Sequence, residues 1–243
     1  MTTIAIYWGY ISGDEHLTEE QFADIDFGTP SIDTEFIIFD PLASSFFQGT
    51  YFKMYEKKLQ FPHRNLPSMR SETMLVYEGT KIKIIDPPVE LETPVGVLLC
   101  LFIGEKQEIQ NAISFLGQKI NLKFSPCELN LQKLFAKFAK TRFQIFPISL
   151  QIGNLHLKEN LVGDLEVYLK EKKDFIKKMQ EYSTRITSIR FQIKEVSFYL
   201  TIKAERNGLV EFDKNITNLN LKNTIYELLT LSVSTSKRQE VIS

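Results

Sequence analysis

The residues best placed to do chemistry are two carboxylates and a lysine in the first quarter of the chain. Asp40 directly follows the apolar run 36–39, which we expect to be a strand that stops before Pro41. Glu56 and Lys58 are two positions apart in a segment that we also expect to be a strand. Alternate residues of a strand face the same side, so these two side chains would project together.

An acid at a strand end, followed by an acid-x-Lys pair on the next strand, resembles the pattern of restriction-type metal-dependent nucleases. The resemblance implies that Asp40 and Glu56 hold a divalent cation and that Lys58 positions the attacking water. It covers three residues, and their surroundings are rich in lysine rather than hydrophobic, which departs from the pattern. Another acid-x-Lys triplet lies at 171–173. A nuclease-like enzyme is therefore the alternative function. An ordinary solvated strand without catalytic function would explain the same three residues.

Other reactive residue types lack the spacing that catalysis or cofactor binding needs. The 11 glycines are scattered and form no loop that could cradle a phosphate. His16, His63 and His156 are far apart, and neither Cys100 nor Cys127 lies near one of them, so we expect no metal site. Two cysteines in a chain of this length do not make a disulfide framework. We therefore expect no cofactor and favour a non-enzymatic protein.

Basic side chains offer the better-supported candidate for a binding surface. Amphipathic helices are expected over 129–138 and 163–182, with lysines at helical spacing along one face of each. Such a face can follow the phosphates of a nucleic acid, although lysines on the wet side of a helix are also ordinary solvation. The candidate nucleic-acid-binding residues are Lys133, Lys137, Lys140, Arg142, Lys170, Lys173 and Lys177.

Charge is unevenly divided along the chain, whose net charge is −1. Residues 1–102 carry −8 and residues 103–243 carry +7, and the first 40 residues hold nine carboxylates and no lysine or arginine. Such asymmetry indicates a charged partner. The acidic stretch 13–40 could mimic a polyanion, dock a basic protein or fold against the basic helices of the same chain, and the sequence leaves these three open.

The order of the strands and helices expected to position these residues predicts an α+β fold with a mostly antiparallel sheet and packed helices. A proline-punctuated stretch at 87–94 divides an acidic β-rich lobe, residues 1–94, from an α+β domain, residues 95–243, with a ferredoxin-like arrangement and a polar tail at 232–243. The expected strands are 2–11, 36–39, 52–58, 73–77, 81–85 (with a turn at 78–80), 97–103, 120–124, a strand pair over 143–157 with a bend at Pro147, and a meander over 186–212; the other expected helices are 105–116 and 219–231.

Composition and the lack of a basic leader or long apolar segment predict an intracellular protein, cytoplasmic or nuclear, with no membrane partner. The leading interpretation is a non-enzymatic binding or scaffold subunit of a larger assembly. It would bind a protein partner or a second copy, with nucleic acid as a further candidate partner for the basic helices.

Overall fold

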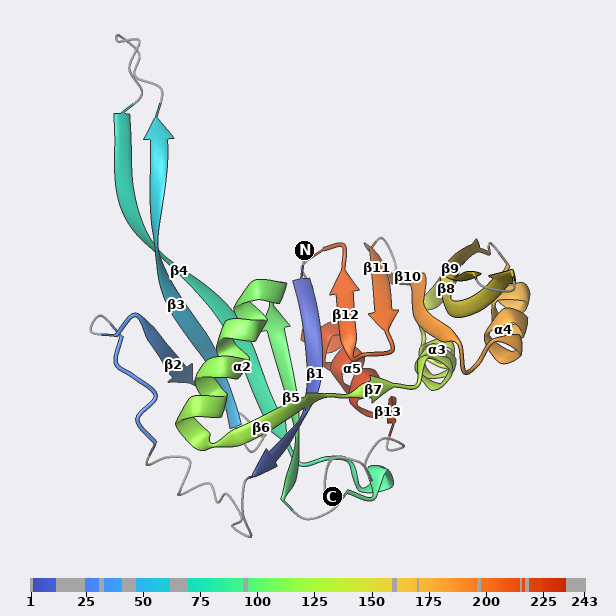
Figure 1. Cartoon of the computed structure of the whole chain (residues 1–243), viewed down its shortest axis with the longest axis horizontal. Coiled ribbons are helices and arrows are strands. Elements are labelled where there is room, and N and C mark those ends of the chain that lie inside the picture. Colours follow the sequence, from blue (N-terminus) through green and yellow to red (C-terminus); the bar gives the residue numbers. More distant parts are fainter. Residues whose placement is uncertain are drawn as a thin grey trace.

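The computed structural model describes residues 2–11, 25–30, 33–40, 47–61, 70–93, 96–158, 161–169, 171–195, 198–214, 216 and 219–234. These residues form an α+β fold in which one large antiparallel sheet crosses the molecule and helices pack on both of its faces (Figure 1). The predicted fold class and the antiparallel sheet are confirmed. The predicted acidic stretch lies partly outside the described residues, as does most of the polar tail.

The sheet holds 11 strands among the described residues, and β1 (Thr2–Ile11) lies near its centre. β5 (Val97–Gly104) pairs along one side of β1, and β12 (Leu209–Phe212) and β6 (Leu122–Pro126) share the other side. The order is β2-β3-β4-β5-β1-β12-β11-β10-β8-β9. The remaining strands are β2 (Glu35–Phe39), β3 (Phe47–Phe61), β4 (Arg70–Ile85), β8 (Gln144–Lys158), β9 (Leu161–Tyr168), β10 (Ile186–Glu195) and β11 (Phe198–Glu205), and a separate pair is β7 (Glu128–Leu129) with β13 (Val233–Ser234).

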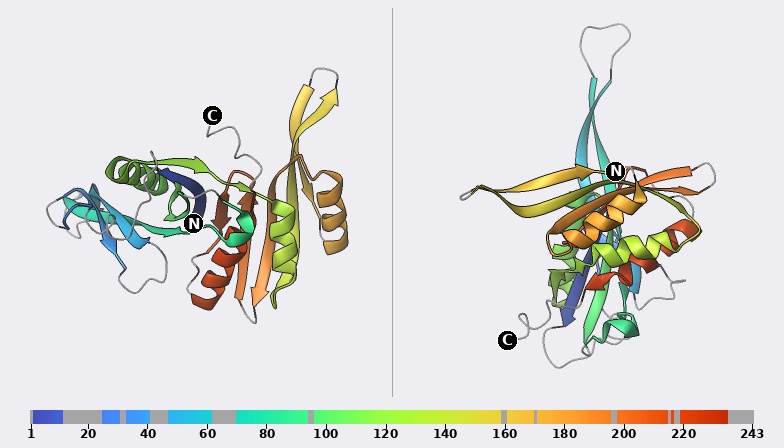
Figure 2. Two further views of the ribbon diagram at one scale, coloured as in Figure 1. Left: turned by 90° about the horizontal axis from the view of Figure 1, so that it is seen from below. Right: turned by 90° about the vertical axis from the view of Figure 1, so that its right-hand side faces the viewer.

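The helices divide between the two faces of this sheet. α2 (Lys106–Ile120) packs on one face, which we call face A, over β3, β4, β5 and β1. α3 (Leu131–Ala139), α4 (Lys172–Glu181) and α5 (Leu219–Thr230) pack on the opposite face B, over β1 and the strands from β12 to β8. We call β2 to β5 with α2 the arm half, and β8 to β12 with α3 to α5 the three-helix half (Figure 2). A short 3-10 helix, η1 (Val89–Leu91), joins β4 to β5.

The apolar residues of β1 explain its central place. Ile4 and Ile6 point into the core on face B, and Ala5 points into the core on face A. β1 is therefore covered on both faces, as its sequence predicts. The predicted strand, helix and strand that follow residue 96 are also confirmed, as β5, α2 and β6. α2 ends at Asn121, in the left-handed conformation at φ 49°, rather than at Gly117.

Three predictions about the elements need correction. β4 runs unbroken from Arg70 to Ile85, so the expected turn at 78–80 is wrong. Residues 161–168 form strand β9 rather than the start of a helix, because they pair with β8, and this tertiary pairing overrides the helical spacing of their apolar residues. Residues 144–158 form one strand, β8, rather than the expected strand pair with a bend at Pro147. The division at residue 94 stays a prediction; the strands on either side of it, β4 and β5, pair with each other.

Candidate functional site

The three residues of the nuclease-like pattern do not come together. The Asp40 main-chain N–H donates to the Gln48 carbonyl at 2.9 Å, which places Asp40 beside the start of β3. Glu56 and Lys58 lie at least eight residues further along that strand, about 26 Å away at the usual rise per residue. Among the described residues, no three His, Cys, Asp or Glu side chains form a group that could hold a metal. A site that needs all three residues is therefore not assembled.

The predicted basic residues lie on two neighbouring helices. The Phe135 and Phe175 rings, 4.7 Å apart, join α3 to α4. Lys133 and Lys140 of the α3 region are exposed, as is Arg142, while Lys137 is half-buried; Lys173 and Lys177 of α4 are exposed, and Lys170 lies outside the described residues.

The two lysine rows stay separate. Gln132 of α3 donates its side-chain N–H to the Met179 carbonyl of α4, so this flank of α3 faces α4. Lys133 and Lys137 follow about 100–140° further round the helix and point away from that contact. α3 contains no acidic residue, whereas on α4 the Lys178 ammonium pairs with Glu181 at 2.7 Å. The two helices carry the same net charge of +2, but only on α3 is the basic surface free of acidic side chains.

A feature that the sequence analysis missed is the long arm formed by β3 and β4. β2 pairs with β3 only up to Lys53, and β5 reaches β4 only at Lys81. Beyond these points β3 and β4 pair with each other alone, up to Phe61 and Arg70, and project from the body (Figures 1 and 2). We call the described residues 54–61 and 70–79 the arm.

Apolar side chains gather on face B of the arm and of the sheet below it. The Phe36 ring stacks on Phe52 at 5.4 Å and meets the Tyr77 ring edge-on at 5.7 Å. Further side chains on this face are much exposed: Ile38 at 48%, Tyr77 at 43% and Leu75 at 56%. We call Phe36, Ile38, Phe52, Met54, Leu75 and Tyr77 the apolar strip.

The strip has no covering element within the described residues, since α2 lies on face A and α3 to α5 pack over strands beyond β4. On the other face of the arm Met74 is also exposed, at 47%. The run Met74–Tyr77 therefore offers apolar side chains to water on both faces of a two-stranded ribbon. The sequence shows the run, but only the pairing shows that neither face is covered.

A buried polar cluster joins the base of the arm to α2. The Tyr55 hydroxyl donates to Glu108 Oε1 at 2.6 Å, and Asn111 Nδ2 donates to the same hydroxyl at 3.0 Å. Glu108 is 5% exposed, and its Oε2 has no partner among the described residues, nor does the buried Tyr51 hydroxyl. Burial, followed by the bond to Glu108, raises the pKa of Tyr55 to about 12.

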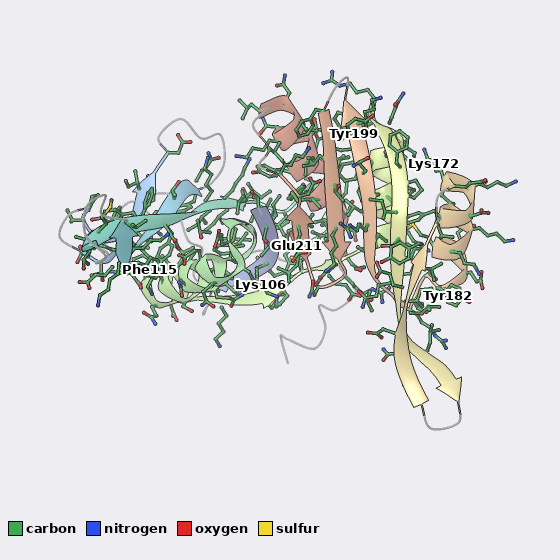
Figure 3. The ribbon with its side chains drawn as sticks, turned by 90° about the horizontal axis from the view of Figure 1, so that it is seen from above. Lys106, Phe115, Lys172, Tyr182, Tyr199 and Glu211 are labelled. Atoms are coloured by element: carbon green, nitrogen blue, oxygen red, sulfur yellow. The ribbon has the colours of Figure 1, made fainter. Side chains whose placement is uncertain are left out.

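The open face of the three-helix half carries ion-paired and hydrogen-bonded side chains, together with the exposed rings of Phe146 at 45%, Tyr168 at 68% and Tyr199 at 39%. On face A, Lys203 of β11 pairs with Glu205 at 2.6 Å and with Glu211 of β12 at 3.7 Å. The Ser149 hydroxyl donates to Glu166 at 2.8 Å, and this bond is the main cause that lowers the pKa of the Glu166 carboxyl. Figure 3 shows the molecule from above, with Tyr199 and Glu211 labelled on strands of this half and Phe115 labelled on α2 of the arm half.

A cleft of about 770 Å³ lies beside this open face, between the ends of β8, β10 and β11 and residues 126–128. Its charged groups have partners: Lys203 binds Glu205, and the Arg206 guanidinium donates to the Thr184 carbonyl at 2.7 Å. Burial raises the pKa of the Cys127 thiol that lines the cleft, which keeps it protonated and unreactive. The cleft therefore offers no activated nucleophile.

Comparison with known proteins gives no relative: no protein-family model matches the chain, and no curated protein matches it. None of the helices in the described parts of the chain is long and apolar enough to cross a membrane. The candidate site is therefore defined by geometry alone, and the apolar strip on the arm half is its most distinctive feature.

Proposed function

We propose that this chain is a non-enzymatic binding or scaffold subunit of a larger intracellular protein assembly, and that its partner covers the apolar strip. The observation that carries the proposal is the contrast between the two uncovered sheet faces of one molecule. The uncovered face of the three-helix half carries ion-paired and hydrogen-bonded side chains between its exposed aromatic rings. The uncovered face of the arm half has exposed aliphatic and aromatic side chains, as a face that binds another protein does.

The shape of the arm supports the same function. A two-stranded hairpin without a further layer is at best marginally stable in water, and large exposed apolar side chains add an aggregation hazard. Both problems disappear when a partner packs on the arm. Separated carboxylates, a protonated Cys127 and a cleft whose charges are paired support a binding role over an enzymatic one. The ferredoxin-like arrangement of the C-terminal part stays a prediction.

The test is to purify the tagged full chain from its native cells and to measure the mass of the eluted complex by native mass spectrometry. We expect a complex of fixed stoichiometry. The double variant Leu75→Glu with Tyr77→Glu should release the chain as a monomer. Val89, which is 90% exposed on η1, provides the matched control, and Val89→Glu should leave the complex intact. A monodisperse wild-type monomer without any partner would contradict the proposal.

Nucleic-acid contact through α3 is the second candidate function. The specific observation in its favour is that α3 carries no acidic residue, while Lys133 and Lys140 are exposed. Binding to single-stranded or duplex DNA should weaken steeply with salt, and Lys133→Glu should weaken it further. Lys173→Glu on α4 provides a comparison of equal charge change. Binding that is absent at low salt would remove this candidate.

A further inference from the structure

The outer edge of β4 between Thr73 and Gly79 has no neighbouring strand within the described part of the chain. β5 first meets β4 where Ile103 pairs with Lys81, and β5 ends at Gly104. A strand placed in line with β5 would therefore continue the sheet beside the arm. The backbone N–H and C=O groups of such an edge are a template for an added strand.

This edge lacks the features by which sheets prevent unwanted pairing. From Thr73 to Tyr77 it carries no charged residue and no proline, and Glu78, the one charged residue between Thr73 and Gly79, lies on face A. The register between β3 and β4 also runs without a bulge along the whole arm. Regular, apolar edges of this kind pair readily with another strand.

Other free edges of the same sheet do carry such protection. The β3 edge of the arm presents Glu56, Lys57 and Lys58. β9 carries the acidic side chains of Asp164 and Glu166, and its pairing with β8 is interrupted by register shifts. At the β2 edge, the Ile37 N–H is already occupied, because it donates to the Phe27 carbonyl at 3.1 Å. The β4 edge is thus distinguished from these edges by its chemistry.

Two lysines lie together on face B, where β5 meets β4. Burial, followed by the field of Lys81, lowers the pKa of Lys222 in the first turn of α5. Neither lysine belongs to any ion pair found among the described residues. A carboxylate placed beside them would relieve the repulsion between two like charges.

We propose that β4 receives an extended segment of another protein, which pairs antiparallel along Thr73–Gly79 and carries an acidic side chain beside Gly79. The inference rests on the proposed binding function and specifies the chemistry of the partner. The partner's residues on face B would be apolar and would pack against Leu75 and Tyr77. An acidic side chain opposite Gly79 would be a diagonal neighbour of Lys81, within reach of a long side chain.

A second copy of the chain fits this edge less well. In a symmetric antiparallel pairing, face-B residues of one copy lie opposite face-B residues of the other. On this stretch of β4 they are Thr73, Leu75, Tyr77, Gly79 and Lys81, and none of them supplies a carboxylate. Charge complementarity therefore favours a segment of a different protein.

The test uses the full chain and two synthetic probes. The first probe is glutamate followed by three threonine-valine pairs, and the second begins with lysine instead. Amide hydrogen exchange locates the binding, and fluorescence anisotropy measures the affinity. We expect the first probe to slow exchange of those amides between Thr73 and Gly79 that point away from β3 at least tenfold. It should bind roughly fivefold more tightly than the second at low salt, a preference that shrinks as salt rises.

Matched variants separate edge pairing from other effects. Leu75→Lys places a lysine on the β4 edge, whereas Glu56→Lys places a lysine at the position of β3 that pairs with Leu75. Only Leu75→Lys should abolish the protection. Replacing Lys81 and Lys222 by Met should remove the preference for glutamate while the peptides still bind.

Specific outcomes would overturn the inference. Strand addition would be overturned if amide exchange were unchanged at millimolar probe, or if the probe slowed amide exchange equally in the Leu75→Lys variant. Equal affinity of both probes would overturn the acidic partner. A dimer of the wild-type chain that Leu75→Lys dissolves would make a second copy the occupant. If strand addition fails while the native complex still breaks up with Tyr77→Glu, the binding function stands and the edge pairing falls.

Discussion

The two halves of the sheet are covered by helices on opposite faces, and the faces they leave open differ in kind. In the three-helix half, the open face A carries paired charges such as Lys203 with Glu205 and Glu211. In the arm half, the open face B carries Leu75 and Tyr77, with no helix of the described residues over them. Face A also exposes aromatic rings, but the Lys194 ammonium lies over the Tyr199 ring there, whereas the rings of the apolar strip contact each other. The difference indicates that face B of the arm half is the one suited to bind another protein.

The same comparison holds for the way each half ends. The outer strand β9 carries acidic residues and irregular pairing, which discourage a further strand. The arm ends in a regular ladder whose β4 edge is apolar from Met74 to Tyr77. The outer strand β9 is thus poorly suited to accept a further strand, whereas the β4 edge of the arm, which lies inside the strand order and is left free where β5 ends, remains open to one.

The largest expected effect tests whether the two halves fold as one unit. Phe102 is buried in the core under α2, and Phe191 is buried in the core under α3. Replacing either by Ala should cost about 3–5 kcal/mol of unfolding free energy. Because β1 contributes to both cores, both variants should lower the same urea transition, followed by Trp8 fluorescence. Two separate transitions would show that the two halves unfold as independent domains.

The next effect concerns the buried cluster that fixes the arm to α2. Glu108→Ala leaves the Tyr55 hydroxyl without its acceptor and should cost about 1–3 kcal/mol. Glu108→Gln keeps an acceptor oxygen and should cost less, as chemical denaturation would measure. An equal loss in both variants would show that the charge itself, rather than the acceptor, stabilises the cluster.

The same cluster predicts a pH dependence. The pKa of Tyr55 is raised from 10.0 to about 12, so the folded state favours the neutral phenol. Its contribution to stability is complete below pH 10 and is lost as the pH rises towards 12 and beyond. Tyr55→Phe should remove this loss from the alkaline stability profile. An unchanged profile would contradict the assignment to Tyr55.

A smaller effect is expected from the ion pairs of the open face A. Lys203→Met should cost about 0.5–1 kcal/mol, since the side chains are partly exposed and solvent screens them. The hydrogen bond to Glu205 raises the pKa of Lys203 above its ordinary 10.5. The contribution is therefore complete below pH 10.5 and lost as the pH rises through the raised value. Lys173→Met on α4 should cost nothing measurable at any pH.

The smallest expected effect is a gain in stability rather than a loss, and it concerns a lysine of the arm half. Lys81→Met removes a like charge beside Lys222 and should stabilise the free chain by about 0.2–0.5 kcal/mol. Because the pKa of Lys222 is lowered, wild-type stability should also rise as the pH approaches 10.5 from below. Lys83→Met, on the same face of β4, is the control. A loss of stability in Lys81→Met would show that the lysine has an unrecognised partner.

Local pattern was sufficient where an element's own residues decide its structure. The apolar run of β5, the stripe of α2 and the Asn207-Gly208 turn were all predictable, and Gly208 indeed has a φ of 86°. Prediction failed where a distant strand decides the outcome. Residues 161–168 have helical spacing but pair with β8, and β4 continues through Gly79 because β3 pairs with it throughout.

The sequence by itself determined the α+β class, the strand at residues 2–11 and the basic face of α3, because these depend on the periodicity of neighbouring residues. Tertiary structure alone decided which faces stay open. The Met74–Tyr77 run would suit a buried strand equally well, and only the end of β5 at Gly104 leaves it exposed. Exposure is a property of what other segments cover, and no local pattern contains it.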